Sequence, residues 1–178
     1  MTGDGLPELL VAGGSTQVVE VWHKSGAKSF ARLSQKSVPG FASSVVAVDV
    51  SRDGKLDLVV ALSDQKNLAL LTGQGNGDFG NAQTVPSGTE PRWLHAIDTN
   101  CDGIPDIVAS SATENKLGLL WGTERGMLAS PRIVDLSTQL SGVAQSLAIA
   151  DVNFDGLADL VVGSTQTPAY LLIANISP

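Results

Sequence analysis

The sequence predicts an all-β protein, a partial β-propeller of about three and a half four-stranded blades. Three observations support this prediction. One segment pattern recurs along the chain about every 50 residues. Each repeat contains short apolar runs bounded by Gly, Asp and Ser, as β-strands do. Four short strands in about 50 residues is the spacing of a propeller blade.

The repeat is carried by four segments that align without a gap: TGDGLPELLVA (2–12), DVSRDGKLDLVVA (49–61), DTNCDGIPDIVAS (98–110) and DVNFDGLADLVVG (151–163). Their last acidic residues follow one another at steps of 49, 49 and 53 residues and are Glu8, Asp57, Asp106 and Asp159. An apolar run begins eleven residues after each of these acids. We therefore predict one domain with repeats near residues 1–44, 45–93, 94–146 and 147–178.

Each repeat is predicted to form four strands in the same order. In the second repeat, the first three strands are expected at 45–50, 58–62 and 68–72, where Val, Leu and Ala dominate. A fourth, weaker strand is expected at 79–85 there and at 30–36 in the first repeat. Apolar residues on both faces of these strands predict sheets that pack between neighbouring sheets.

One segment has a different pattern. Five of its apolar residues recur at the spacing of one face of a helix; they are Leu140, Val143, Ala144, Leu147 and Ala148. Gly142 weakens a helix at this place, and the equivalent segments 42–48 and 91–97 lack the pattern. We therefore predict a strand here as well.

The composition excludes several classes of protein. The chain has 178 residues, with 18 acidic residues against 11 Lys and Arg and a net charge of −7. This balance argues against binding to nucleic acid, whose phosphates need clustered Lys and Arg. The chain has no apolar run long enough to span a membrane and no recognisable secretory signal at its start. A single cysteine, Cys101, excludes a disulfide framework.

The spacing D-x-N-x-D-G-x-x-D predicts calcium-binding loops. Ca²⁺ takes six to eight oxygen ligands. Side chains at loop positions 1, 3, 5 and 9 can converge on one ion, together with the carbonyl of position 7, and glycine at position 6 permits the sharp turn. The third and fourth repeats hold complete sets, which are Asp98, Asn100, Asp102 and Asp106, and Asp151, Asn153, Asp155 and Asp159.

The other two loops are less complete. The second loop offers Asp49, Ser51, Asp53 and Asp57, in which serine is a weaker ligand than asparagine. The first keeps only Asp4 and Glu8, with Thr2 at position 3, and whether it binds metal stays open. The carbonyls of Ile104 and Leu157 are expected to complete the two full sets.

Charge and spacing favour these calcium loops over two other interpretations, which are simple hairpin turns and EF-hands. Eleven of the 18 acidic residues lie at the loop positions, so the rest of the chain is mildly basic. Hairpin turns explain Asp and Gly but not carboxylates at positions 1, 5 and 9 in successive repeats. An EF-hand needs a glutamate at position 12, where the chain has Val60, Ala109 and Val162, and it needs flanking helices.

The calcium loop, the following hairpin strand and the later G-N-G-D-F-G segment (75–80) resemble the FG-GAP/VCBS repeat of integrin-α-like β-propellers. The resemblance covers essentially the whole chain. It implies Ca²⁺ in the loop between two strands of a blade, a location outside cells or on the cell surface, and binding to proteins or glycans. Leu128 stands where the pattern has phenylalanine, and the first loop and Ser51 depart from it too.

The expected function is a non-enzymatic, calcium-stabilised module for binding a protein or a glycan. The alternatives are a lectin on the same scaffold, which would use exposed aromatic residues in repeated positions, and a polysaccharide lyase or hydrolase fragment. Segment 75–80 also matches G-x-G-x-x-G, but NAQTVP follows it where a nucleotide site needs a helix. No catalytic or cofactor-binding residue is predicted, and packing is the expected role of Trp22 and Trp121.

The strand count also predicts an assembly. About 14 strands are expected, starting inside a calcium loop and ending after the third strand of a blade. Such an arc exposes a bare sheet face at each end. We therefore expect a homo-oligomer, most simply a dimer that closes one ring across two chains.

Overall fold

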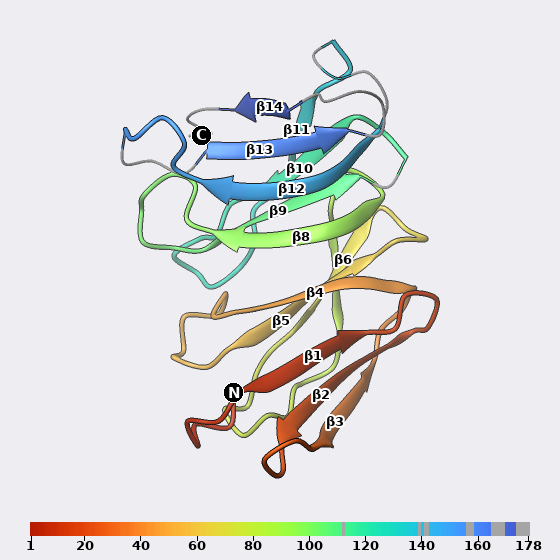
Figure 1. Ribbon diagram of the computed structural model, residues 1–178, viewed down its shortest axis with the longest axis vertical. Coiled ribbons are helices and arrows are strands. Elements are labelled where there is room, and N and C mark those ends of the chain that lie inside the picture. Colours follow the sequence, from red (N-terminus) through yellow and green to blue (C-terminus); the bar gives the residue numbers. More distant parts are fainter. Residues whose placement is uncertain (112, 139, 141–142, 156–158, 165–169, 174–178) are drawn as a thin grey trace.

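The computed structural model is all-β (Figure 1). It describes residues 1–178 apart from 112, 139, 141–142, 156–158, 165–169 and 174–178. The described residues form 14 strands in four antiparallel sheets, which we number sheets 1 to 4 along the chain. These residues contain no helix that could cross a membrane.

Sheets 1 and 4 have three strands each, and sheets 2 and 3 have four. Sheet 1 contains β1 (Glu8–Ala12), β2 (Val18–Lys24) and β3 (Phe30–Ser37). Sheet 2 contains β4 (Ala42–Val48), β5 (Asp57–Leu62), β6 (Asn67–Leu71) and β7 (Gln83–Pro86). Sheet 3 contains β8 (Pro91–Ile97), β9 (Asp106–Ser111), β10 (Lys116–Leu120) and β11 (Arg132–Asp135). Sheet 4 contains β12 (Ala144–Ala150), β13 (Asp159–Ser164) and β14 (Tyr170–Ile173).

Within each sheet, every strand pairs with the next strand of the chain. Strands β4, β8 and β12 begin their sheets, and each leads through a loop to a strand that starts with an aspartate. Sheet 1 has no counterpart of these first strands among the described residues, because β1 starts with Glu8 and corresponds to β5, β9 and β13. The chain is thus a partial propeller.

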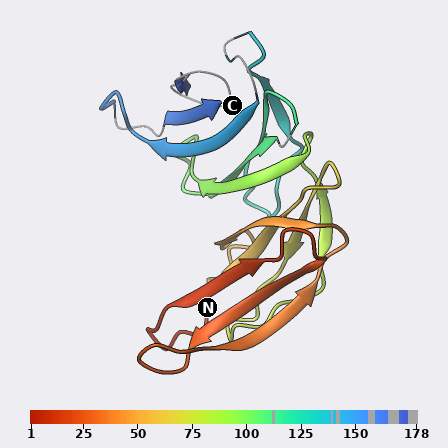
Figure 2. The same ribbon diagram turned by 45° about the vertical axis from the view of Figure 1, so that its right-hand side comes forward.

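The four sheets stack face to face, from sheet 1 at the bottom to sheet 4 at the top of Figure 1. Figure 2 shows that sheets 1 and 4 lie at opposite ends of the stack and do not meet. Three clusters of buried apolar side chains join sheet 1 to 2, sheet 2 to 3 and sheet 3 to 4. All six residues of β5 and of β9 are buried because a sheet covers each of their faces.

The predicted fold class is confirmed, and so is the strand expected where the helical pattern occurs, at Ala144–Ala150. The fourth strand of sheet 2 begins at Gln83, later than predicted. Phe79, expected to open that strand, instead forms an isolated bridge with Gly73 and is only 2% exposed in the core. β4 begins at Ala42, before the predicted start at residue 45, and a bulge between Ala42 and Ser44 disturbs the alternation that would mark its start.

Candidate metal centres

The candidate loops join β4 to β5, β8 to β9 and β12 to β13, and they lie along one side of the molecule, on the left in Figure 1. The acid at position 1 organises each turn. Asp49 accepts hydrogen bonds from the backbone amides of Asp53 (3.2 Å) and Gly54 (2.9 Å). Asp98 accepts them from Asp102 (3.1 Å) and Gly103 (2.8 Å) in the same way. The loop therefore wraps around the carboxylate of position 1.

Positions 3 and 5 lie beside each other in both complete loops. The side-chain amide of Asn100 donates to Oδ2 of Asp102 at 2.9 Å, and its carbonyl oxygen accepts from the Asp102 backbone amide at 3.1 Å. Asn153 and Asp155 repeat these contacts at 3.0 and 2.8 Å. In the second loop, the Ser51 hydroxyl instead lies 3.5 Å from Asp49.

The carboxylate at position 5 is exposed and is held by an amide two residues further on. Asp102 accepts from the Ile104 amide at 2.7 Å, and Asp53 accepts from the Lys55 amide at 2.9 Å. The Lys55 amide is the main reason why the pKa of Asp53 lies below its ordinary value. Asp53 is therefore a carboxylate anion near neutral pH, the form that binds a cation.

The acid at position 9 is buried in the second, third and fourth loops. Asp57, Asp106 and Asp159 are at most 1% exposed. Both oxygens of Asp57 accept backbone amides, from Ser51 in the loop and from Gly73 beyond the end of β6, each at 2.8 Å. A buried carboxylate needs such donors, so this residue ties its loop to the neighbouring strand end.

The third loop has the same tie. Asp106 accepts from the backbone amides of Thr99 and Gly122, both at 2.8 Å. Asp159 accepts from the backbone amide of Val152 at 3.0 Å. Position 9 is therefore a structural residue as well as a candidate ligand.

Gly73 and Gly122 complete this arrangement, and the sequence analysis did not identify them. A Cβ atom on Gly73 would lie 2.0 Å from the Leu56 carbonyl oxygen, and one on Gly122 would lie 2.4 Å from that of Pro105. Only glycine lets the strand end come this close to the loop. The signal was present in the sequence, because each glycine follows its position-9 acid by 16 residues (57 to 73 and 106 to 122).

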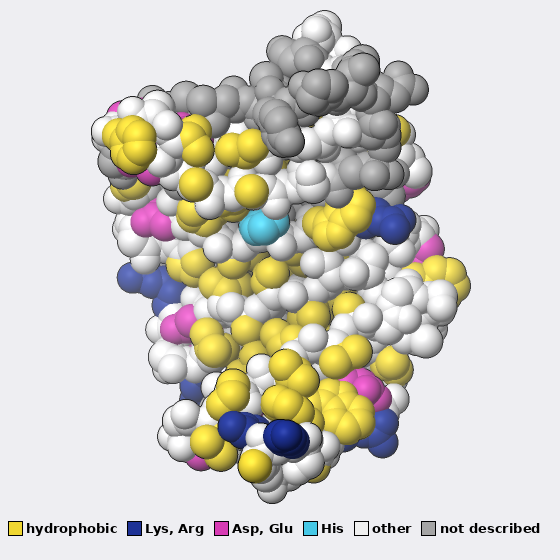
Figure 3. All heavy atoms as spheres, in the orientation of Figure 1, with side chains coloured by type: hydrophobic (Ala, Val, Ile, Leu, Met, Phe, Trp, Pro, Cys, Tyr) yellow, Lys and Arg dark blue, Asp and Glu magenta, His cyan; other side chains and the backbone are white. Residues whose placement is uncertain are grey.

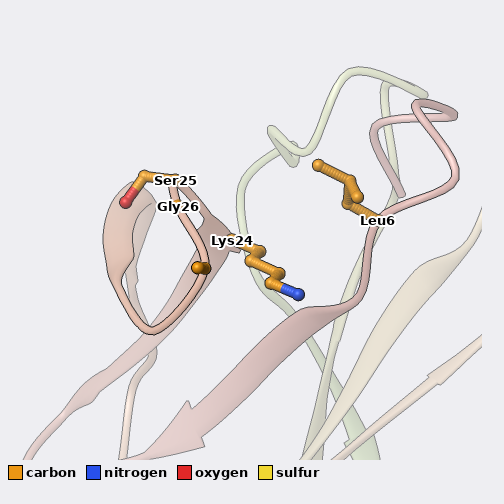
Figure 4. Close-up of a pocket in the computed structure, with 5 residues that line it drawn as sticks. Leu6, Lys24, Ser25 and Gly26 are labelled. Atoms are coloured by element: carbon orange, nitrogen blue, oxygen red, sulfur yellow. The ribbon is translucent and has the colours of Figure 1, made fainter.

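The first loop is built differently. Glu8 stands at position 9 and accepts hydrogen bonds from the backbone amide and the hydroxyl of Thr2, which hold its pKa below the ordinary value. Lys24 occupies the place of Gly73 and Gly122. A cavity of about 340 Å³ opens there, lined by Leu6, Lys24 and the turn of Ser25, Gly26 and Ala27 (Figure 4). The first loop therefore lacks the tie to the strand end.

Position 4 has the same unusual backbone in every loop. Arg52, Cys101 and Phe154 have φ values of 59°, 59° and 62°, and Gly3 has 77° in the first loop. This left-handed conformation costs about 1–2 kcal/mol for a residue with a side chain. These three are the only such residues other than glycine in the described chain, so the strain is confined to the candidate loops.

The donor set fits a hard cation such as Ca²⁺, because every candidate ligand atom is an oxygen. The loops bring positions 1, 3 and 5 together, while the position-9 carboxylate faces backbone amides. Among the described residues, no three Asp, Glu, His or Cys side chains gather in the arrangement of a metal site. The Leu157 carbonyl, expected to complete the fourth set, lies outside the described residues.

The FG-GAP-like repeat matches the chain three times, at residues 1–60, 49–109 and 98–162. The chain belongs to the FG-GAP-like repeat family. Successive matches overlap at 49–60 and 98–109, which contain the candidate loops and the strands after them. The resemblance noted from the sequence is thus confirmed, and family and fold together support a repeat-based binding or scaffold module.

This chain spans less than a tenth of the length of the two solved chains that it resembles. The Tc holotoxin pore of Photorhabdus luminescens is 19% identical with a TM-score of 0.54, covering 96% of this FG-GAP chain and 9% of the other chain. A crystal structure of TcdB2–TccC3–Cdc42 is 20% identical with a TM-score of 0.49, covering 95% and 8%. At such identities the likeness to the holotoxin pore shows the fold alone. No curated protein matches the FG-GAP chain.

Proposed function

We propose that this FG-GAP protein is a non-enzymatic, calcium-stabilised module that binds a protein or a glycan. The observation that carries the calcium part is the repeated loop, in which positions 1, 3 and 5 bring together side chains that each offer an oxygen ligand. The residues that would hold the ions are Asp49, Ser51, Asp53 and Asp57, Asp98, Asn100, Asp102 and Asp106, and Asp151, Asn153, Asp155 and Asp159.

Bound Ca²⁺ would reduce the repulsion among the three carboxylates of a loop and stabilise the folded chain by mass action. The partly neutral ligand set suits the millimolar calcium of extracellular fluids better than the calcium of the cytoplasm. We therefore propose a location outside the cell or on its surface, as the family resemblance also suggests.

The surface around β4, β8 and β12 is the proposed binding face. Figure 3 shows hydrophobic side chains in the middle of this view and charged ones mostly around its rim. The Arg92 guanidinium lies 4.9 Å from the centre of the half-buried Trp93 ring. An aromatic face already stacked by a cation is less available to a sugar, which favours a protein ligand over a glycan.

The acids outside the loops support a non-enzymatic role. Seven acids lie outside the loops. Six of them form an ion pair or accept a hydrogen bond from a backbone amide or a hydroxyl of this chain; they are Glu20, Asp64, Asp78, Glu90, Glu114 and Asp135. General acid–base catalysis needs a carboxylate or imidazole free to exchange a proton with a substrate. The lyase or hydrolase alternative would therefore have to use Glu124, His23 or His95.

Calcium binding is tested by titration calorimetry and thermal unfolding. We expect a higher melting temperature in millimolar Ca²⁺ than in excess EDTA. Asp102→Ala should remove one bound ion, because Asp102 is exposed and acts only within its loop, while Asp4→Ala should leave the ion count unchanged. Superimposable unfolding curves with and without Ca²⁺ would refute the calcium part of the proposal.

A further inference from the structure

The turn at 123–127, between β10 and β11, lies against a candidate loop of the preceding repeat. A Cβ atom on Gly126 would lie 2.6 Å from the backbone carbonyl oxygen of Ser51 and 3.0 Å from its Cα atom. Ser51 stands at position 3 of the second loop, 75 residues earlier in the chain (126 to 51). The turn of the third repeat therefore touches the backbone of the second loop directly.

The preceding pair of repeats shows a related contact. Gly77 lies in the equivalent turn between β6 and β7, and a Cβ atom there would lie 3.4 Å from Cγ2 of Thr2, although its nearest neighbour is Leu33 of β3. Thr2 stands at position 3 of the first loop, again 75 residues earlier (77 to 2). Both glycines have positive φ, 82° at Gly77 and 69° at Gly126. The contact is thus a feature of the repeat.

The turn of the third repeat is fixed at its base. An isolated bridge between Gly122 and Leu128 closes it, and the Gly122 amide donates to the buried Asp106 at 2.8 Å. Within the turn, the Gly126 amide donates to the Thr123 carbonyl at 2.9 Å. Because its base is tied to the third loop, the turn gives the second loop a firm support.

Ser51 connects this support to the candidate ligands of the second loop. Its backbone amide donates to Oδ2 of Asp57 at 2.8 Å, and its hydroxyl lies 3.5 Å from Oδ1 of Asp49. A shift of the Ser51 backbone therefore acts on positions 1, 3 and 9 together. Ca²⁺ holds its oxygen ligands at about 2.3–2.6 Å, so such a shift weakens the binding of an ion.

We propose that the turn at 123–127 is a positioning element of the second candidate calcium site, so that the affinity of this loop for Ca²⁺ depends on the following repeat. Gly126 is the residue that allows the contact. A side chain there would push Ser51 away or displace the turn, and either change removes the support. The affinity part rests on the proposed calcium binding, whereas support of the loop does not need the ion.

Hydrogen exchange in EDTA tests the support without metal, with Gly126→Ala and the matched control Gly14→Ala. Both glycines have a φ of 69°, so alanine meets a similar backbone cost at each, but a Cβ on Gly14 has no atom within 4 Å. Measured by mass spectrometry, exchange in segment 49–57 should be about tenfold faster in Gly126→Ala than in Gly14→Ala. Equal exchange in the two variants would overturn the positioning role.

Titration calorimetry tests the affinity in a chain that carries Asp102→Ala and Asp155→Ala, which leaves the second loop as the candidate site with the largest intact set. Adding Gly126→Ala should weaken Ca²⁺ binding about tenfold, whereas adding Gly14→Ala should leave it unchanged. Unchanged binding with Gly126→Ala would overturn the proposal while the calcium function stands. If the background chain binds no Ca²⁺, the proposed function fails for this loop and the affinity part fails with it, and exchange in EDTA decides the support.

Discussion

At the scale of single residues, position 4 of the candidate loops carries strain that can be removed. Cys101 is exposed and has a φ of 59°, a conformation that glycine adopts without cost. We expect Cys101→Gly to raise the free energy of unfolding by roughly 0.5–1 kcal/mol, after allowing for the extra freedom of glycine in the unfolded chain. Urea unfolding in EDTA measures this. As a contrast, Gly103→Ala, at a φ of 79°, should destabilise the protein by a similar amount.

Gly73 offers a second test at this scale, because its missing side chain makes room for the loop. A Cβ there would lie 2.0 Å from the Leu56 carbonyl oxygen, and backbone cannot easily move aside. We expect Gly73→Ala to cost about 2–3 kcal/mol of stability. Gly80 is the matched control, because its Cβ would lie at an ordinary 3.6 Å from the nearest atom. Equal effects of the two substitutions would contradict this close approach.

At the scale of the loop and its strands, substitutions of Asp57 and Asp53 distinguish the structural role of the loop acids from their role in metal binding. Asp57 satisfies two backbone amides, whereas the exposed Asp53 holds only its own turn and the Lys55 ammonium. In EDTA, Asp57→Ala should lower the free energy of unfolding by about 2–3 kcal/mol, and Asp53→Ala should change it little. In Ca²⁺, both variants should lose the ion of that loop. Calorimetric unfolding under the two conditions distinguishes these roles.

Sheets 1 and 2 are also joined by an ion pair, between Lys36 of β3 and Asp78 in the β6–β7 turn, at 2.8 Å. The hydrogen bond from Lys36 is the main cause that lowers the pKa of Asp78 below 3.8. The pair therefore stabilises the fold above pH 3.8 and ceases to do so as the pH falls through the lowered pKa. Both groups are partly exposed, so the contribution is a few tenths of a kcal/mol. Lys36→Met should flatten the acid limb of stability against pH, measured by urea unfolding between pH 5 and pH 2.

The sequence predicted elements better than it predicted the contacts between them. Periodic spacing identified the strands and the acidic loops because both are local patterns. It did not identify the burial of Asp57 or its bond to Gly73, since that contact depends on how the end of β6 packs over the loop. The late start of β7 was missed for the same reason, because Phe79 reads as a strand residue but packs into the core.

At the scale of the whole molecule, the stacking predicts a gradient of local stability. β5 and β9 are paired along both edges and covered on both faces, whereas β1 is paired along one edge among the described strands. Amide hydrogen exchange followed by mass spectrometry should therefore be slowest in β5 and β9 and faster in β1. Protection of β1 equal to that of β5 would show that another strand pairs with its free edge.

The bond between a buried acid and a glycine 16 residues later also governs how such a chain can change during evolution. Asp57 and Gly73 lie within one repeat, so duplication or deletion of whole repeats keeps each pair intact. A recombination point between them would combine a loop with a strand end that does not fit it. The first repeat has Glu8 and Lys24 at these two places, and the fourth has Asp159 and Asn175. In the two repeats that hold both the acid and the glycine, a change by one whole repeat therefore preserves the fit between loop and strand end.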